Sequence, residues 1–362
     1  MTAGKWVREA RIPSASQSMA ADGGSEVGRD GVLRLCAPLG QGEALARWLK
    51  LARTGALPHA FVVAGARGAG KTTVIQWLTA ALLCPSDLDD AGPCGVCRTC
   101  TRVANGMHPD VHLVDRARDE DDKDEWKKSF YVIKVDQIRR AQETLQRHAV
   151  EGRARVLVIA DADCMDEEGQ NALLKTLEEP GERTYLLLEA ARPENLLPTI
   201  HSRAQRLGVL PLAEAVLRRE LSARIPERSP HHEDAVRLAG GSLGQALLAC
   251  TERVVQLHHL VRQALAEPVR LRPVALAREA LAGARSRHLE VDAARNFLWL
   301  LRRELHAAVC ALADAADATY PAPRTEPWTA WLERTLATER DLDLLIPPEQ
   351  ALVACLASFS TT

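Results

Sequence analysis

The feature that most constrains the fold of this chain is a glycine-rich stretch between a short apolar run and a helical pattern. Gly65 to Thr72 reads Gly-Ala-Arg-Gly-Ala-Gly-Lys-Thr and matches G-x-x-x-x-G-K-[ST] at every defined position. The apolar run 60–64 before it predicts a buried strand, and 73–83 after it predicts a helix. Strand, loop and helix in this order predict a phosphate-binding loop (P-loop) on an α/β sheet. The plain alternative is a glycine-rich turn that binds nothing.

Each residue type in this loop has a chemical reason. Glycines let backbone N–H groups turn inward around phosphate oxygens, and Lys71 neutralises charge on the β- and γ-phosphates. The Thr72 hydroxyl can bind Mg²⁺, and the amino end of the following helix adds a favourable dipole. We therefore expect ATP or ADP with Mg²⁺ as the ligand, with occupancy left open. The candidate nucleotide-binding residues are Gly65, Gly68, Gly70, Lys71, Thr72 and Thr73.

Two further apolar runs, 156–159 and 185–188, predict central strands, and helical spacing predicts one helix at 137–147, before the first of these runs, and another at 170–177, between them. Continuous apolar strands are typical of a parallel sheet buried on both faces. From residue 211 onward no strands are expected, so the carboxy-terminal part predicts an all-helical region. Residues 1–30, with their Ser, Gly, Ala and Asp, predict a disordered extension.

The strand at 156–159 leads into a sequence that lacks one expected acid. A P-loop ATPase needs an acid at the end of a neighbouring strand for the Mg²⁺ shell, and a second acid directly after it polarises the attacking water. In one register the metal position falls on Ala160 and the water position on Asp161. In the other, Asp161 is the metal acid and Ala162 stands where the second acid belongs. Either register predicts weak or absent hydrolysis at this site.

Four of the nine cysteines lie close together in the sequence. Cys84, Cys94, Cys97 and Cys100 follow C-x₉-C-x₂-C-x₂-C, and four thiolates can complete a tetrahedral zinc shell at ~2.3 Å per bond. The alternatives are a redox C-x-x-C pair, which leaves two thiols unexplained, or four unrelated cysteines. Because a closed four-thiolate shell leaves no open coordination position, the expected zinc is structural.

Composition excludes several classes of protein. The chain has 362 residues and a net charge of −2, so no general basic field draws it to nucleic acid. A zinc-dependent DNA-binding protein is therefore disfavoured, and any DNA contact is expected from a local patch or from partners. No apolar stretch approaches the ~20 residues needed to cross a bilayer, which predicts a cytoplasmic protein and no membrane partner. In a reducing cytosol the nine cysteines should not form a disulfide framework.

Several of these segments together resemble the motor domains of bacterial DNA polymerase III clamp-loader subunits, a family of AAA+ proteins. The resemblance covers Leu39 to about Leu212, and it implies an AAA+ P-loop fold. It divides the chain into an AAA+ domain with the zinc module (31–210), a helical lid (211–256) and a helical collar for oligomerisation (257–362). It rests on the P-loop, the cysteine cluster, Leu57 to Ala60, Asn171 to Pro180, Arg192 to Glu194 and Leu197 to Arg203, of which Asn171 to Pro180 is the most specific.

Two types of subunit in that family share these motifs, the gamma/tau motor and the stator. The motor has an Asp-Glu pair where this chain has Ala160-Asp161, a Thr where it has Ala190-Ala191, and a lid Arg where it has Gly244. Three altered positions make the chain resemble the stator, with an ATP-hydrolysing gamma/tau-type motor as the alternative. A stand-alone P-loop nucleotide kinase is a further alternative, disfavoured by the helical carboxy-terminal third.

The pair Ser202-Arg203 resembles the family's Ser-Arg-Cys motif, with Ala204 in place of the cysteine. The resemblance implies that Arg203 is an arginine finger, which acts in trans on the γ-phosphate of a neighbouring ATPase subunit. Taken alone, such an arginine is more often a solvated charge. The implied partners are the gamma/tau and delta subunits, the sliding clamp transiently, and primed DNA through the assembly, in clamp loading for DNA replication.

Overall fold

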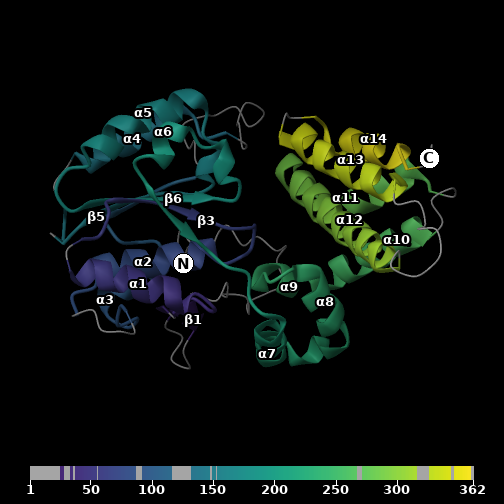
Figure 1. Ribbon diagram of the computed structural model, residues 1–362, viewed down its shortest axis with the longest axis horizontal. Helices are drawn as coiled ribbons and strands as arrows, with labels where there is room; N and C mark the ends of the chain where they lie inside the picture. Colours follow the sequence, from purple (N-terminus) through teal and green to yellow (C-terminus); the bar gives the residue numbers. More distant parts are fainter. Residues whose placement is uncertain are drawn as a thin grey trace. The chain divides into compact units, whose positions relative to one another are not determined.

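The computed structural model describes residues 25–27, 33–35, 37–54, 56–86, 92–115, 132–146, 149–151, 153–266, 271–315, 326–343 and 346–359. The chain forms two compact units. The first comprises residues 1–229 with 239–246, and the second comprises residues 230–238 with 247–362. Figure 1 traces the described helices and strands along the sequence.

A five-stranded sheet forms the centre of the first unit. Its order is β4-β5-β6-β3-β7, and every neighbouring pair is parallel. The sequence predicts the three central strands, but the two edge strands carry polar residues and lack the continuous apolar run of a strand buried on both faces. The strands are β3 (Ala60–Ala64), β4 (Val111–Val114), β5 (Arg155–Ile159), β6 (Thr184–Ala190) and β7 (Gln205–Gly208).

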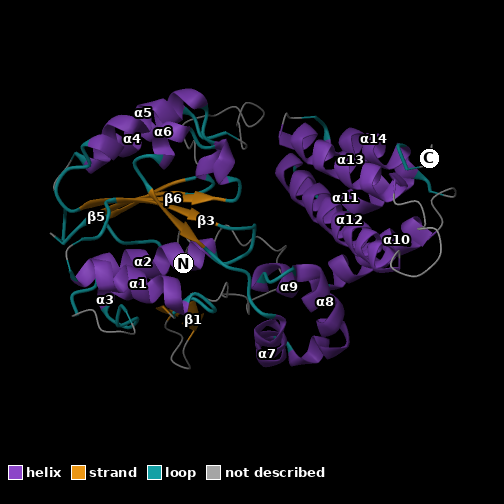
Figure 2. Cartoon of the chain, viewed as in Figure 1, coloured by secondary structure: helices purple, strands orange, loops and turns teal. Residues whose placement is uncertain are grey.

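Helices cover both faces of this sheet, as Figure 2 shows. Alternate residues of β5 divide between two apolar clusters, with Val156 and Val158 in one and Leu157 and Ile159 in the other. The α/β sheet buried on both faces, predicted from sequence, is confirmed. The first cluster contains residues of α1 (Gly42–Arg53), α2 (Lys71–Leu83) and α3 (Arg98–Ala104); the second contains residues of α4 (Val135–Leu145), α5 (Glu167–Glu178) and α6 (Pro198–His201).

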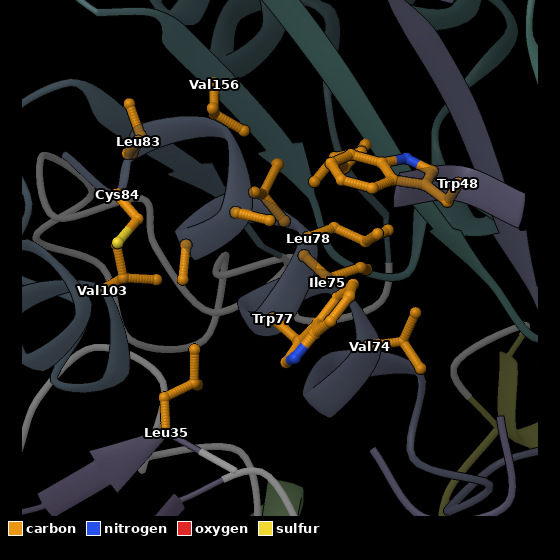
Figure 3. Close-up of a cluster of buried hydrophobic side chains, with 14 of the residues drawn as sticks. Leu35, Trp48, Val74, Ile75, Trp77, Leu78, Leu83, Cys84, Val103 and Val156 are labelled. Atoms are coloured by element: carbon orange, nitrogen blue, oxygen red, sulfur yellow. The ribbon is translucent and has the colours of Figure 1, made fainter. Parts of the chain in front are cut away.

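The first cluster surrounds α2, the helix that follows the P-loop (Figure 3). The Trp77 and Trp48 rings meet edge to face at a centroid separation of 6.3 Å. Trp48 also lies 6.5 Å from the ring of Phe61 on β3. Because eleven of the thirteen residues of α2 are buried, the helix is held on several sides, and the start of α2 is fixed relative to the sheet.

A short hairpin precedes the sheet. Strands β1 (Ser25–Val27) and β2 (Leu33–Leu35) pair antiparallel, and the Leu35 amide donates to the Gly95 carbonyl at 3.2 Å. The prediction of disorder is therefore wrong for Ser25–Val27, because they find backbone partners in β2. The rest of the predicted extension lies outside the described residues.

The carboxy-terminal region is helical, as the sequence predicts. After α7 (Glu214–Arg224), α8 (His232–Ala239) and α9 (Leu243–Ala249), the second unit packs α10 to α14 into a bundle. Its core includes Phe297, Leu298 and Leu301 of α12, and Trp331 stacks on Phe359 at 4.7 Å. The bundle helices are α10 (Glu252–Ala266), α11 (Pro273–Leu281), α12 (Arg287–Ala315), α13 (Glu326–Asp343) and α14 (Pro348–Ala357). Among the described residues, no helix has the length and hydropathy to cross a membrane.

Candidate nucleotide and metal sites

The P-loop leaves β3 at Ala64 and enters α2 at Lys71. Gly68 has φ +72° and Gly70, the residue that caps α2, has φ +89°. Both values lie in the left-handed region that glycine adopts without strain, which is why the loop needs glycine at these two positions. The Gly65 amide donates to the Ala190 carbonyl at 3.2 Å, so the start of the loop is anchored to β6.

The two polar side chains of this loop that would act on a phosphate and a metal both face one carboxylate. The Lys71 ammonium donates to the Ala66 carbonyl at 3.1 Å and lies 3.7 Å from Oε1 of Glu189. The Thr72 hydroxyl lies 3.4 Å from each carboxylate oxygen of Glu189. Lys71 itself is buried. Glu189 is thus part of the candidate site, although it is not among the residues expected from the sequence.

Glu189 comes from β6, where it is the one charged residue in an otherwise largely apolar strand, Thr184–Ala190. It is buried, and this burial raises the pKa of its carboxyl to about 7, although the Lys71 ammonium pulls that pKa down. Burying an ionisable group is costly unless a partner faces it. A lone glutamate directly after the apolar run 185–188, a predicted buried strand, is therefore a signal that can mark this position.

Beyond β5 the backbone turns away from the sheet. The Ala160 amide still donates to the Val114 carbonyl of β4 at 2.9 Å, so the alternation of β5 extends to Ala160 and sets this buried residue on the same face as Val158. Asp161 adopts φ +51°, which breaks the strand geometry. Of the two registers that the sequence left open, this geometry favours the one with Ala160 at the metal position.

A second acid near the loop has a backbone role. The carboxylate oxygens of Asp163 accept from the amides of Ala191 at 3.3 Å and Arg192 at 3.1 Å. Asp163 is buried, so these bonds hold the turn after β6 against η1 (Ala162–Cys164). Neither Ala190 nor Ala191 carries a side-chain hydroxyl, although the turn that bears them is well anchored.

The segment 239–246, which belongs to the first unit, contacts the P-loop. The Ser242 hydroxyl donates to the Gly68 carbonyl at 2.6 Å and accepts from the Gln245 amide at 3.1 Å. A small cavity of about 30 Å³ lies at this junction. It is lined by Pro38, Leu39, Gln41, Gly68, Ala69, Gly70, Thr73, Leu212, Leu243 and Gly244.

The four clustered cysteines meet in space as the sequence predicts. Their sulfurs all lie within 4.8 Å of one another, and Cys84 Sγ lies 3.6 Å from Cys94 Sγ and 3.9 Å from Cys97 Sγ. The edge of a zinc–thiolate tetrahedron with bonds of ~2.3 Å is about 3.8 Å long. These separations exceed a disulfide bond of ~2.05 Å by far, so the four thiols are suited to holding a metal such as zinc.

Glycine and backbone groups shape this cluster. Gly92 and Gly95 have φ +96° and +72°, and a Cβ at Gly92 would meet the Trp77 ring at 2.1 Å. The Cys100 amide donates to Cys97 Sγ at 3.4 Å. At Cys94, hydrogen bonds from the amides of Val96 and Cys97 and from the neighbouring thiols outweigh desolvation and lower the thiol pKa to about 6, whereas burial raises the pKa of the Cys97 and Cys100 thiols. Such bonds favour the thiolate, the form in which cysteine binds metal.

Arg203 lies between α6 and β7, where its side chain is held by several acceptors. Its Nε and Nη2 lie 3.0 and 2.7 Å from Oε1 of Glu178, and its Nη1 donates to the Thr199 carbonyl at 3.0 Å. The side chain is 35% exposed, so the guanidinium is fixed yet accessible. Glu178 is the last residue of α5 and belongs to the segment 171–180.

Arg203 lies at the amino ends of the parallel strands, whereas the P-loop lies at their carboxyl ends. In the parallel pairing of β7 with β3, Gln205 lies opposite Phe61, near the beginning of β3, whereas the P-loop follows Ala64 at its end. Strand β3 spans about 13 Å at ~3.3 Å per residue. At this edge the His59 ring also contacts the Leu177 carbonyl at 2.8 Å, which ties the end of α5 to the start of β3. Arg203 is therefore remote from the phosphate loop of its own chain.

The parallel sheet, the P-loop after its interior strand β3 and the helices on both faces define an AAA+ type P-loop protein. Residues 40–213 match the model of the family described as "DNA polymerase III, delta subunit". It is similar to DNA polymerase III subunit delta' of Pseudomonas aeruginosa, with 35% identity over 198 residues, or 54% of this chain and 57% of that protein.

Two further relatives come from Escherichia coli strain K12. Subunit delta' is 32% identical over 211 residues, 58% of this chain and 60% of that protein. Subunit tau is 32% identical over 209 residues, 56% of this chain and 30% of that protein. A gamma-subunit-related protein of Thermotoga maritima overlays 89% of this chain and 99% of its own at 17% identity, with a TM-score of 0.42. The chain thus spans about three fifths of the length of the delta' relatives.

Proposed function

We propose that this chain is a delta-prime-type stator of a DNA polymerase III clamp loader. In this role it joins gamma/tau and delta subunits in the cytoplasm, and the assembly places a sliding clamp on primed DNA. The stator lends Arg203 to the ATPase site of a neighbouring subunit. The similarity to subunits named delta' and tau supports the assembly, and the position of Arg203 away from its own P-loop together with the missing acid at Ala160 supports the stator.

The observation that carries this proposal is the placement of Arg203 at the sheet edge opposite its own P-loop. An arginine that is permanently charged and planar suits a phosphoryl group whose charge is spread over several oxygens. Because Arg203 is remote from Lys71, such a contact must be made to a nucleotide on another chain. The exposed guanidinium and its fixed orientation fit that use.

The chain's own P-loop is proposed to bind nucleotide without efficient turnover. The residues that would hold ATP or ADP are Gly65, Gly68, Gly70, Lys71, Thr72 and Thr73, with Mg²⁺ on the Thr72 hydroxyl. Bound Mg²⁺ neutralises phosphate charge. Slow hydrolysis is expected because Ala160 and Ala190 offer no group that orients water or metal.

Reconstitution with motor and delta subunits tests the stator role. At the neighbouring site, Arg203→Ala should reduce ATP turnover by ~10³-fold or more. The total ATPase rate of the assembly should therefore fall by at least the fraction that this one site contributes. Ring assembly, measured by size-exclusion chromatography with light scattering, should be unchanged. An Arg203→Ala assembly with full ATPase would overturn the proposal. Replacing Arg219, an exposed arginine on α7, provides a matched control.

The similarity to tau and the complete P-loop favour one alternative, an ATP-hydrolysing gamma/tau-type motor. This alternative predicts DNA-stimulated ATPase activity from the isolated chain. The stator predicts turnover near background in the same assay. Brisk turnover that is abolished by Lys71→Ala would therefore replace the stator with the motor.

The cysteine cluster is proposed to hold one structural zinc ion. Cys84 lies at the end of α2 and packs beside Leu83 and Val103 in the core of Figure 3. The other three ligands lie in the loop 92–97 and in α3. Zinc would join these segments and so fix the end of the helix that begins at the P-loop.

A further inference from the structure

The position after β5 that lacks a carboxylate, Ala160, lies beside a glutamate of the neighbouring strand β6. In the parallel pairing of β5 with β6, Ile159 lies opposite Leu188. Continuing this register by one residue sets Ala160 beside Glu189. Since Ala160 and Glu189 follow residues of the second cluster by one step, both side chains lie on the opposite face, toward α2.

We infer that Glu189 takes over the metal-side position that Ala160 leaves without a carboxylate, so that this P-loop binds nucleotide as its Mg²⁺ complex. The inference rests on the nucleotide binding proposed above and is independent of the role of Arg203. A glutamate side chain is one methylene longer than that of an aspartate. Glu189 can therefore reach the Thr72 hydroxyl from the adjacent strand.

The distances fit a shared metal site. In a Mg²⁺ octahedron with bonds of ~2.1 Å, two adjacent oxygen ligands lie about 3.0 Å apart. Both carboxylate oxygens of Glu189 lie 3.4 Å from the Thr72 hydroxyl, so a small adjustment of one side chain allows both residues to bind one ion, directly or through a water. Carboxylate and hydroxyl oxygens are ligands that Mg²⁺ prefers.

The ion pair with Lys71 explains why a buried carboxylate is tolerated when no phosphate is bound. Lys71 lies 3.7 Å from Glu189 and donates to the Ala66 carbonyl. When phosphate oxygens occupy the loop they compete for this ammonium. The carboxylate then needs a new positive partner, and Mg²⁺ at Thr72 supplies one.

The two neighbouring acids are less suited to this position. The carboxylate of Asp163 accepts from the amides of Ala191 and Arg192, and using it for a metal would release the turn after β6. Asp161 lies in a left-handed turn beyond the end of β5. Glu189 therefore offers the carboxylate that already faces both P-loop side chains.

The test measures binding of a fluorescent ADP analogue to the full-length chain in excess MgCl₂ and in EDTA. For the unaltered chain we expect Mg²⁺ to tighten binding about tenfold, the equivalent of one good ligand. Glu189→Ala and the volume-conserving Glu189→Gln should reduce this ratio to less than about twofold. Glu182→Ala removes an exposed acid before the same strand and should leave the ratio unchanged.

Moving the carboxylate back to β5 provides the decisive variant. Glu189→Ala combined with Ala160→Asp should restore the Mg²⁺ dependence that Glu189→Ala loses. Retention of the full Mg²⁺ ratio by Glu189→Ala would overturn the inference, as would equal affinities of the unaltered chain in MgCl₂ and EDTA. Tighter binding by Glu189→Ala in EDTA with an unchanged Mg²⁺ ratio would also overturn it and leave Glu189 as a counter-ion of Lys71.

The outcomes separate this inference from the proposals on which it depends. If the unaltered chain binds no nucleotide even with Mg²⁺, both the inference and the proposed nucleotide binding fail, while the Arg203 experiment still decides the stator role. If Mg²⁺ dependence follows Glu189 but Arg203→Ala has no effect on partners, the metal position stands and the stator does not.

Discussion

At the scale of single residues, the acids near the candidate sites each contact a charged or polar partner that holds them in place. Glu189 faces Lys71 and Thr72, Glu178 faces Arg203, and Asp163 faces two amides. Each of these acids comes from a different segment than its partner. The carboxylates therefore join segments of the first unit, and changing one should affect the function of its partner more than the stability of the fold.

The contact of Glu178 with Arg203 predicts a positioning role for the glutamate. Since the pair is partly exposed, its loss should weaken orientation by no more than about 1 kcal/mol. In the reconstituted assembly, Glu178→Gln should therefore lower ATPase less than Arg203→Ala does, by about two- to fivefold at the affected site. The neighbouring exposed Glu179→Gln is the matched control.

A double-mutant cycle distinguishes positioning from a general effect on the fold. Adding Glu178→Gln to Arg203→Ala should cause no further loss, because the guanidinium to be positioned is already gone. A loss of the same size in both backgrounds would show that Glu178 acts in some other way.

At the scale of elements, the amino end of α2 carries the P-loop and its carboxyl end leads into the cysteine cluster. The helix is buried along nearly its whole length, so its two ends are mechanically connected. Sequence patterns predict both ends separately. Their connection through one rigid helix makes metal binding relevant to the integrity of the nucleotide site.

We expect about one zinc ion per purified chain, and near-complete loss of zinc in Cys97→Ser. Losing a structural metal costs several kcal/mol, which corresponds to a fall of roughly 5–10 °C in the Tm of the P-loop unit. Metal content is measured by plasma mass spectrometry and Tm by circular dichroism. Cys310→Ser, at an exposed cysteine of α12, should change neither. A Cys97→Ser protein that retains its zinc would contradict the four-thiolate site.

At the scale of the whole molecule, the chain forms two compact units with different chemistry. The first carries the P-loop, the cysteine cluster and Arg203, and the second is a helical bundle with its own ion-pair network. In that bundle Arg237 of α8 and His258 of α10 lie 2.7 and 2.8 Å from the same oxygen of Glu304 on α12. One half-buried carboxylate therefore connects three helices.

This network predicts acid sensitivity of the bundle. The hydrogen bond from His258, together with Arg237, lowers the pKa of Glu304 to about 2. Because the folded-state pKa is depressed, the stabilisation is complete above pH ~4.5 and is lost as the pH falls toward 2. Glu304→Gln should cost about 1–2 kcal/mol at pH 7, after allowance for solvent screening, and progressively less below pH 4.5.

Urea unfolding of the full chain between pH 3 and 7 measures this difference. Glu349→Gln, which breaks the exposed pair with Arg278, should have no measurable effect at any of these pH values. A Glu304→Gln difference that stays constant down to pH 3 would show that the lowered pKa does not contribute to stability.

How far the sequence predicts this protein depends on how local each feature is. The P-loop and the central strands β3, β5 and β6 are contiguous patterns, and all were predicted at nearly their final bounds. The edge strands β4 and β7 were missed because each has four residues and includes polar ones, so neither has a clear apolar pattern. The helix at 42–53 was missed as well, although its amphipathic spacing offered a signal.

The residues of the candidate site also fall into those that a local sequence pattern predicts and those that it does not. Lys71 and Thr72 follow from a short motif, and the four cysteines follow from their spacing, because neighbours in sequence must be neighbours in space. The absence of an acid at Ala160 is also visible in the sequence. That Glu189 faces the position is not, because it depends on β6 pairing with β5 in one particular register, and a shift by one residue would turn Glu189 to the other face.

The sequence by itself thus determined the loop that can bind phosphate, the thiols that can bind a metal and the alternating α/β pattern of the first unit. Only the tertiary structure decided that Glu189 faces Thr72 and that Arg203 lies at the sheet edge away from Lys71. The physical reason is that local motifs are fixed by backbone geometry over a few residues. Strand order and register are instead fixed by the packing of segments far apart in the chain, and these decide which side chains meet.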